Sequence, residues 1–246
     1  MDPFLRSISL NRMRVDNFDA FPFSVPAVRE LNSLELHPQV TFFIGENGTG
    51  KTTLLEGIAL VEGFNYEGGT RNFTVERHDE RYRLAGALGV ARGVRRARHD
   101  SFYLRAESFY NIATEIDRLG LIREGGAYGN KSLHAQSHGE AFLTIFLQRM
   151  GGNGLYLLDE PESALSPQRQ LAFLAAMHEH VRRGSQFIIA THSPIIMAYP
   201  QAVIYQFSET GIAPVEYTDT EHYKVTNAFL NRREKMLEEL LADDDD

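Results

Sequence analysis

The chain of 246 residues contains no cysteine and no long apolar run. Without cysteine it can form neither a disulfide nor a thiolate metal site, which fits a reducing compartment. No segment approaches the roughly 18 consecutive apolar residues that a membrane span requires. The first residues include an acid and lack the apolar stretch that is typical of a signal peptide. We therefore expect a cytoplasmic protein with no membrane segment of its own.

The chain also lacks an excess of positive charge, since its formal net charge is -8. A protein this acidic does not attract nucleic acid through its overall charge. Residues 91–99 are nevertheless locally basic, and Arg105 follows them. Two interpretations stay open: the arginines of this segment bind the phosphates of a nucleic acid, or they have no such role and either lie in a solvated loop or pair with the excess acids. The arginines in question are Arg92, Arg95, Arg96, Arg98 and Arg105.

Short apolar, β-rich segments predict three buried strands, at residues 40–44, 155–158 and 187–190. A helix is expected from about Lys51, and a later hairpin is expected over residues 203–207 and 212–216. Residues 168–183 predict an amphipathic helix with one apolar stripe, and residues 221–241 predict another helix. The stripe consists of Leu171, Leu174, Ala175 and His178. Alternating strands and helices predict an α/β fold, with a mostly parallel sheet that carries helices on both faces.

The segment after the first predicted strand matches the pattern G-x-x-x-x-G-K-[ST] in full. Glycines let backbone N–H groups close around phosphate oxygens, and the following helix adds the positive end of its dipole. We expect Lys51 to reach the β- and γ-phosphates of ATP and the Thr52 hydroxyl to bind Mg²⁺. The alternative is a glycine-rich turn with a chance Lys-Thr pair, but the strand before it and the helix after it are the context that a P-loop requires. The predicted nucleotide-binding residues are Gly45, Glu46, Asn47, Gly48, Thr49, Gly50, Lys51, Thr52 and Thr53.

Two adjacent carboxylates, Asp159 and Glu160, end the second predicted strand. This is the edge at which open α/β sheets bind their ligands. We expect Asp159 to hold Mg²⁺ and Glu160 to polarise the water that attacks the γ-phosphate. An acidic turn without chemistry is the alternative, and the P-loop in the same chain argues against it.

The sequence Asp159-Glu160-Pro161 resembles the Walker B and catalytic glutamate segment of ABC-type ATPases. Three further segments follow that family's order: residues 137–140 resemble its signature motif, residues 163–166 its D-loop, and His192 its switch histidine. Each of these segments alone also fits a helix cap or a structural histidine. The resemblance implies a P-loop NTPase fold in which Glu160, His192 and Lys51 are catalytic.

In ABC-type ATPases two nucleotide domains pack head to tail, and the signature helix of one faces the γ-phosphate bound by the other. The resemblance therefore implies an ATP-dependent homodimer in which Ser137, Gly139 and Glu140 contact the partner's nucleotide. The chain departs from the family pattern at His138, Glu140 and Ser166, where glycine, glutamine and aspartate are usual.

The Q-loop of the family is matched best by residues 102–107, which places Glu107 near the metal. We therefore predict Thr52, Asp159 and Glu107 as the Mg²⁺ ligands. No aromatic residue before the P-loop is identified for stacking the adenine, so the preference for ATP over GTP stays open.

The motifs suggest three parts: a nucleotide-binding α/β core in residues 1–63 and 151–230, an inserted, mainly helical subdomain in residues 64–150, and a C-terminal helix end with an acidic tail in residues 231–246. The clearest strand inside the insertion is residues 102–104. No internal repeat or heptad tract is visible.

The P-loop and the start of its helix, residues 54–59, resemble the SMC/RecF-like branch more than transporter subunits. The insertion is too short for a coiled-coil arm, so the chain is similar to compact, stand-alone bacterial head ATPases. Members of that branch act on DNA or in defence, which implies an ATP-driven switch on nucleic acid or on an effector protein. The alternatives are the ATP-binding subunit of a membrane transporter and a low-turnover ATP sensor.

Overall fold

The computed structural model describes residues 2–65, 68–69, 81–94, 101–107, 109–118, 132–149 and 151–242. Its largest sheet has six strands, in the spatial order β5-β6-β7-β3-β8-β9. In that order they are Phe102–Arg105, Leu155–Asp159, Gln186–Ala190, Val40–Ile44, Val203–Ser208 and Gly211–Pro214. Neighbouring strands pair in parallel from β5 to β8, and β9 pairs antiparallel with β8. The predicted mostly parallel sheet, its three buried strands and the late hairpin are confirmed.

A second sheet has three antiparallel strands in the order β2-β1-β4. They are Ser33–Glu35, Leu5–Leu10 and Leu88–Arg92. The sequence pattern predicts none of them, because each is short and mixes serine, glycine or charge with its apolar residues.

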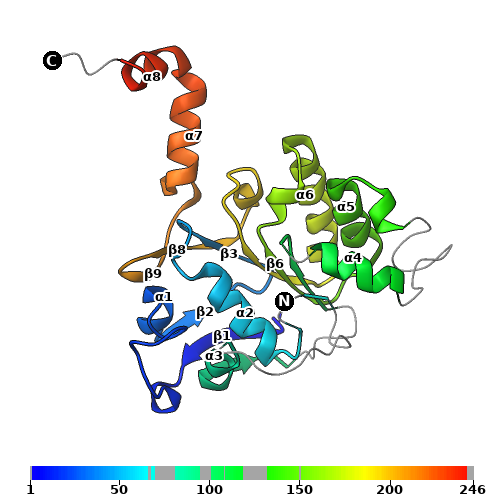
Figure 1. The fold of residues 1–246 in the computed structure, drawn as a ribbon, viewed down its shortest axis with the longest axis vertical. Helices are drawn as coiled ribbons and strands as arrows, with labels where there is room; N and C mark the ends of the chain where they lie inside the picture. The colour runs from blue at the N-terminus through cyan, green and yellow to red at the C-terminus, as the bar shows by residue number, and fades with distance from the viewer. Residues whose placement is uncertain are drawn as a thin grey trace.

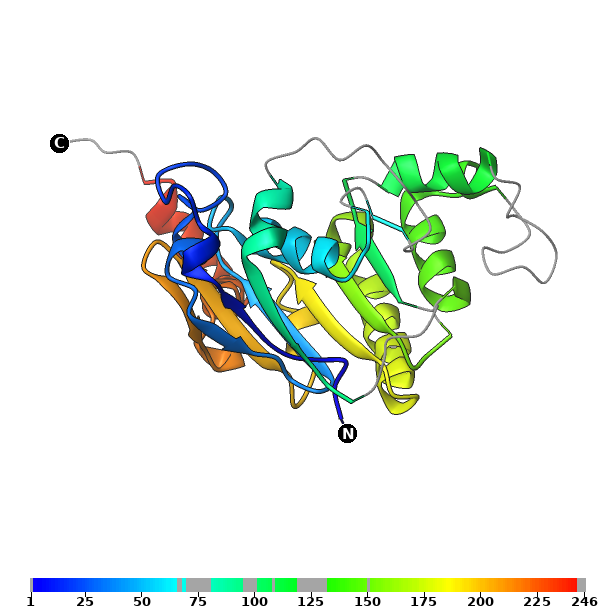
Figure 2. The ribbon, with the colours of Figure 1, turned by 90° about the horizontal axis from the view of Figure 1, so that it is seen from below.

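Both faces of the six-stranded sheet are covered, as the alternation of side chains along its strands requires. In β3, Phe42 points into one core and Phe43 into the other. Helices α4 (Phe109–Arg118), α5 (His138–Arg149) and α6 (Pro167–Arg182) pack on the first face. Helices α2 (Lys51–Val61) and α3 (Arg81–Ala87) pack on the second face together with the small sheet, as Figures 1 and 2 show. The expected helices on both faces are confirmed.

The predicted apolar stripe of α6 is wrong except at Leu174, which is partly buried against the core. The helix buries Phe173, Met177, His180 and Val181 against the sheet. In contrast Leu171 is 59% exposed, and Ala175 and His178 are exposed as well. Both stripes have helical spacing, and the buried one contains the larger aromatic and thioether side chains, so packing volume decides which face turns inward.

Two strands within residues 64–150 pair with strands from outside that range. β5 forms the edge of the large sheet beside β6, and β4 pairs with β1. The subdomain boundaries at residues 64 and 150 stay a prediction.

The C-terminal helix expected over residues 221–241 consists of two helices, α7 (Glu221–Asn231) and α8 (Arg233–Leu240). They project away from the body, as Figure 1 shows, and neither contains a buried residue. We call this helix pair the arm. Within the described residues no helix is both long and apolar enough to cross a membrane.

Candidate active site

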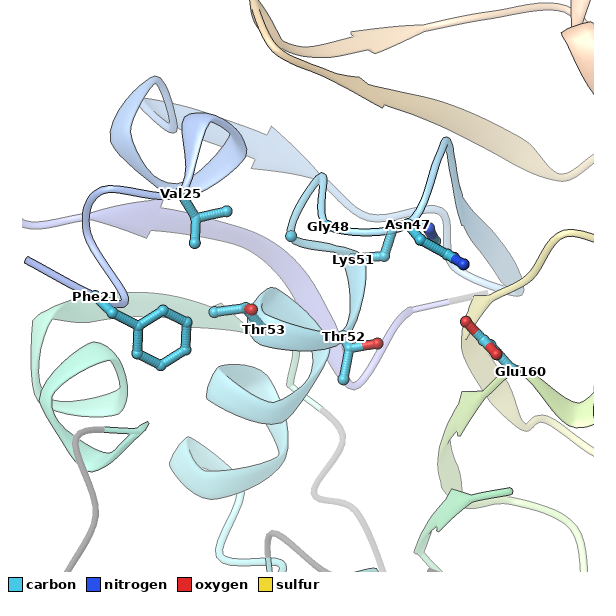
Figure 3. Close-up of a pocket in the computed structure, with 9 residues that line it drawn as sticks. Phe21, Val25, Asn47, Gly48, Lys51, Thr52, Thr53 and Glu160 are labelled. Atoms are coloured by element: carbon cyan, nitrogen blue, oxygen red, sulfur yellow. The ribbon is translucent and has the colours of Figure 1, made fainter. Parts of the chain in front are cut away.

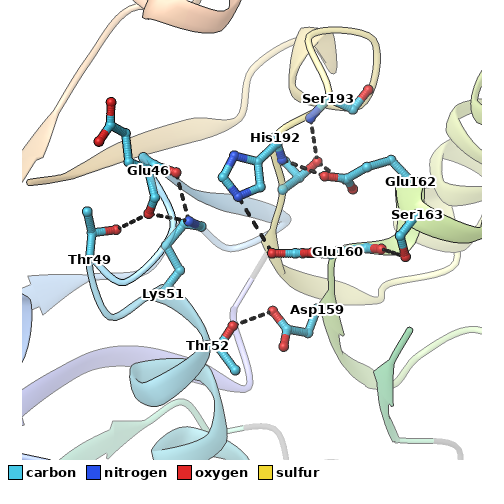
Figure 4. A network of polar contacts seen from close by, with 12 residues as sticks. Glu46, Thr49, Lys51, Thr52, Asp159, Glu160, Glu162, Ser163, His192 and Ser193 are labelled. Atoms are coloured by element: carbon cyan, nitrogen blue, oxygen red, sulfur yellow. Dashed lines mark hydrogen bonds and ion pairs between the residues drawn. The ribbon is translucent and has the colours of Figure 1, made fainter. Parts of the chain in front are cut away.

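The predicted site residues of the core meet at the carboxyl ends of three neighbouring strands, β6, β7 and β3. The P-loop follows β3, Asp159 is the last residue of β6, and His192 lies two residues beyond β7. Figure 4 shows the side chains from these three loops facing one another. Parallel strands present their carboxyl ends at one edge, which is why residues so distant in sequence converge here.

Two glycines of the P-loop occupy positions that other residues cannot. Gly45 and Gly50 have φ of 134° and 102°. A Cβ at Gly45 would lie 2.3 Å from the Phe207 carbonyl oxygen, and one at Gly50 would lie 2.4 Å from Val25 Cγ1. The loop therefore wraps tightly before α2 begins at Lys51, with the N-terminal N–H groups of the helix at its mouth.

Lys51 is buried, with 4% of its surface exposed. Its Nζ donates hydrogen bonds to the carbonyl oxygens of Gly45 at 2.7 Å and Glu46 at 2.8 Å. Thr49 Oγ1 donates to the same Glu46 oxygen at 2.8 Å. Burial lowers the pKa of Lys51, and the carboxylates of Glu160 and Asp159 oppose that change. An anion bound in the loop would favour the charged ammonium further.

Asp159 and Thr52 form a pair of oxygen ligands beside the P-loop. Thr52 Oγ1 donates to Asp159 Oδ1 at 3.1 Å. Burial raises the pKa of Asp159 to about 7, although Arg105 and the Thr52 hydroxyl act in the opposite direction. A hydroxyl and a buried carboxylate that lacks full charge compensation are the hard oxygen donors that Mg²⁺ prefers. These two residues therefore fit the predicted metal.

Arg105 lies behind this pair, where the sequence analysis did not expect it. Its Nη1 is 2.6 Å from Glu56 Oε1, and its Nε is 3.6 Å from Asp159 Oδ2. Its side chain is 12% exposed. The third predicted metal ligand, Glu107, is 84% exposed and pairs with Arg105 Nη2 at 3.1 Å. The role of Glu107 at the metal stays a prediction.

Glu160 has an unusual backbone for a residue other than glycine, with φ 49° and ψ 53°. The conformation is held because its N–H donates to the Ala190 carbonyl at 2.9 Å and its own carbonyl accepts from Ser163 Oγ at 2.9 Å. Such left-handed residues cost about 1–2 kcal/mol and are common at functional sites. Its carboxylate is 39% exposed, and Oε1 lies 3.6 Å from His192 Nε2.

The loop that carries His192 is tied down by Glu162, a half-buried carboxylate that no sequence motif indicated. Glu162 accepts hydrogen bonds from Thr191 Oγ1 at 2.8 Å and from the His192 N–H at 2.5 Å. Burial raises the pKa of Glu162. Burial first, and then the charge of Lys51, lower the pKa of His192, so its imidazole is neutral at pH 7.

A pocket of about 360 Å³ opens beside the P-loop (Figure 3). Seven predicted site residues line it: Asn47, Gly48, Gly50, Lys51, Thr52, Thr53 and Glu160. The other wall is apolar and consists of Phe21, which is 43% exposed, and Val25, which precedes the short helix α1 (Pro26–Arg29). Phe21 could not be predicted from the sequence, because no motif surrounds it.

The signature residues lie at the start of α5, and Figure 1 shows that helix well apart from α2 and its P-loop. Ser137 and Glu140 are exposed, and Gly139 is buried. Glu140 Oε2 accepts from the Ser137 N–H at 3.0 Å, and Arg169 donates to Ser137 Oγ at 3.2 Å and to Glu140 Oε1 at 3.1 Å. A Cβ at Gly139 would lie 2.5 Å from the Ala164 carbonyl oxygen, which requires glycine there. Ser137 thus faces solvent, where a second copy can reach it.

The two arginines of the basic segment that the structure describes follow the ion-pair interpretation. Arg92 Nη2 lies 2.7 Å from Glu62 Oε1, and Arg105 pairs with Glu56 as described above. Arg95, Arg96 and Arg98 lie outside the described residues.

Two family models match the chain. One, described as "AAA domain", matches residues 12–100, and the other, described as "AAA domain, putative AbiEii toxin, Type IV TA system", matches residues 140–198. Together these ranges include the P-loop, Asp159, Glu160 and His192.

The cytochrome c biogenesis ATP-binding export protein CcmA of Paracoccus denitrificans is 31% identical over 165 residues, which cover 65% of this chain and 71% of that protein. Among solved structures, a nucleotide-free ATP-binding cassette from an ABC transporter has a TM-score of 0.51 and 16% identity, covering 93% of this chain and 96% of that one. The SMC head domain from Thermotoga maritima has a TM-score of 0.49 and 17% identity, covering 86% of this chain and 99% of that one. The cassette structure supports the fold, and the Paracoccus relative supports the family. The chain belongs to the ABC-type P-loop ATPases.

Proposed function

We propose that the chain binds MgATP at its P-loop, hydrolyses it at Glu160 within a head-to-tail homodimer, and works as a switch on nucleic acid or on an effector protein. One observation carries the proposal: Lys51, the Thr52–Asp159 pair, Glu160 and His192 meet at one edge of the sheet, beside a pocket with an apolar wall.

Binding would redirect Lys51 from the two P-loop carbonyls to the β- and γ-phosphates. The α2 N-terminus supplies further N–H donors. Phe21 and Val25 offer the base an apolar surface at the other end of the pocket. Thr52 and Asp159 would hold Mg²⁺, which when bound neutralises charge on the phosphates.

Hydrolysis requires a base near the γ-phosphate, and Glu160 lines the pocket on the side opposite Phe21 (Figure 3). Its left-handed backbone, fixed by Ala190 and Ser163, directs the carboxylate toward the P-loop. Neutral His192 retains one ring N–H, which can donate to the γ-phosphate and orient the water.

The proposed dimer is supported by the exposed signature residues at the start of α5. Ser137 and Glu140, at the start of α5, are exposed, and α5 lies apart from α2 and its P-loop. A second copy, turned head to tail, would place them opposite the γ-phosphate.

The test is Glu160→Gln, which keeps the shape of the side chain and removes the base. ATP affinity should be unchanged, turnover should fall about 10²–10⁴-fold, and the protein should accumulate as a dimer with ATP. Turnover is followed by phosphate release, and the mass of the complex by light scattering. A variant that stays monomeric with ATP bound would contradict the dimer.

A second candidate, the ATP-binding subunit of a membrane transporter, is favoured by the Paracoccus relative, whose name describes an export protein. The two candidates differ in what the Glu160→Gln protein retains from cells in the presence of ATP. Nucleic acid or a non-membrane protein supports the switch, whereas a polytopic membrane protein supports the transporter subunit.

A further inference from the structure

A second histidine contacts the candidate switch histidine. His222 lies in the first turn of α7, and its Nε2 is 3.1 Å from His192 Nδ1. The ring centroids are 5.3 Å apart, with 57° between the planes. This contact joins the root of the arm to the loop after β7. That loop carries His192 into the proposed ATP site.

The contact couples the proton positions of the two rings, because one of the two nitrogens must donate and the other must accept. A neutral imidazole has one N–H donor and one acceptor. His192 Nε2 faces Glu160 Oε1 at 3.6 Å and is buried without a hydrogen-bond partner among the described residues. It is the nitrogen directed at the site, so it must carry the proton if His192 is to donate to a phosphate. His192 Nδ1 then accepts, and His222 Nε2–H donates.

We propose that His222 is a positioning residue: its Nε2–H holds His192 in the Nε2–H tautomer and directs that N–H toward the γ-phosphate beside Glu160. The inference rests on the proposed role of His192 in hydrolysis. The arm would then influence ATP turnover directly through His222, which belongs to no nucleotide-binding motif.

The root of α7 is built to hold His222 in place. Thr220 is fully buried, its Oγ1 donates to the Tyr217 carbonyl at 2.8 Å, and the same oxygen accepts from the Tyr223 N–H at 3.3 Å. Tyr217 Oη in turn donates to the Pro194 carbonyl at 3.0 Å, two residues after His192. The rest of the arm buries no residue. A displacement of the exposed helices would therefore act on the site through this first turn.

The experiment compares His222→Phe, which keeps a ring but removes the donor, with His222→Gln, whose amide N–H can replace it. We expect kcat to fall about tenfold in His222→Phe with little change in KM for ATP, because the N–H acts in the transition state. His222→Gln should recover most of that loss. Lys224→Ala, on the exposed side of the same helix, is the matched control and should have wild-type kcat.

The double variant with His192→Ala separates this inference from the proposed function. If His192→Ala lowers kcat and His222→Phe lowers it no further in that background, the two residues act as one unit. Additive losses, or a normal kcat in His222→Phe alone, would overturn the positioning role and leave the function of His192 intact. A normal kcat in His192→Ala would overturn the proposed role of His192 and this inference with it.

A second measurement does not depend on how the variants fold. The ¹⁵N chemical shifts of the His192 ring in the wild-type protein at pH 8 report its tautomer directly. The Nε2–H form supports the inference, and the Nδ1–H form overturns it.

Discussion

Burial and neighbouring charges, more than residue type, determine what a charged residue does in this protein. Arg105 is the clearest example. It lies between Glu56 and Asp159 with 12% of its side chain exposed, whereas the Arg92 side chain is 52% exposed. Breaking a buried ion pair leaves carboxylates without their cation, so Arg105→Met should lower the free energy of unfolding by about 3 kcal/mol.

Arg92→Met is the comparison, because the Arg92 side chain reaches solvent although its partner Glu62 is buried. Its free energy of unfolding should fall less than that of Arg105→Met, because Arg92 pairs with Glu62 whereas Arg105 lies against Glu56, Glu107 and Asp159. Urea denaturation of both variants without nucleotide measures the difference. Equal losses would mean that the contacts of Arg105 add nothing beyond a single pair such as that of Arg92 with Glu62.

His180 predicts a pH dependence of stability. It is buried between the rings of Phe146 and Tyr156, and this burial lowers its pKa below the ordinary 6.5. The unfolded chain then binds more protons than the folded one below pH 6.5, so stability is complete above that pH and falls as the pH drops toward the folded pKa. The contribution to the slope is at most about 1.4 kcal/mol per pH unit.

The variant His180→Gln cannot bind that proton, so its free energy of unfolding should fall less steeply between pH 6.5 and pH 5 than that of the wild type. Denaturant titrations at several pH values measure both curves. Parallel curves would show that His180 titrates equally in both states. Since His37, His192 and His222 also have lowered pKa values, some slope should remain in the variant.

The residues of the site that the sequence predicted share one property: each belongs to a contiguous motif. The P-loop follows an apolar strand, Asp159 and Glu160 lie at the end of a second one, and His192 comes two residues after a third. Phe21, Glu162 and His222 were missed because their roles come from distant segments that fold against those motifs. No sequence pattern around these three residues indicates such contacts.

At the scale of the elements, burial on both faces made strands easy to predict. β3, β6 and β7 are fully buried and consist of continuous apolar runs, whereas β1 and β4 are partly exposed and mixed in composition. The stripe of α6 was assigned to the wrong face because the helix has a second apolar surface. That surface, with Leu171 and Leu174, lines a groove of about 380 Å³ toward α7, together with Pro194 and Leu230.

In the arm, we expect a large truncation to destabilise the protein less than a single substitution at its root. α8 buries no residue, so deleting residues 232–246 removes little apolar contact and should change the free energy of unfolding by less than about 1 kcal/mol. Thr220→Ala removes only a hydroxyl and a methyl group. However, that hydroxyl is the N-cap of α7 at a fully buried position, so the free energy of unfolding should fall by about 1 kcal/mol or more.

Thermal unfolding of the two proteins compares them directly, and the truncated chain should be the more stable one. The opposite order would mean that α8 packs on the body in solution. Because His222 remains in the truncated chain, its turnover should stay at the wild-type value, which a phosphate-release assay checks.

At the scale of the whole molecule, the proposed dimer divides each site between two chains, and this division can be tested by mixing defective proteins. Lys51→Ala removes the cation of the P-loop, and Ser137→Arg places a bulky cation on the exposed start of α5. In any dimer that one variant forms with itself, both sites are defective, so each variant alone should lose most of its ATPase activity.

In a mixed dimer, one site combines the P-loop of the Lys51→Ala chain with the altered α5 of its partner, and both defects fall together there. The other site pairs an intact P-loop with an intact Ser137. Equal mixing should therefore restore activity, up to about a quarter of the wild-type value if half of the dimers are mixed and each has one working site. Phosphate release against the mixing ratio measures this recovery, with Lys235→Ala in place of Ser137→Arg as the control for a neutral surface change. If the mixture of the two defective proteins is no more active than their average, each site is complete within one chain, because only a shared site lets two broken protomers repair each other.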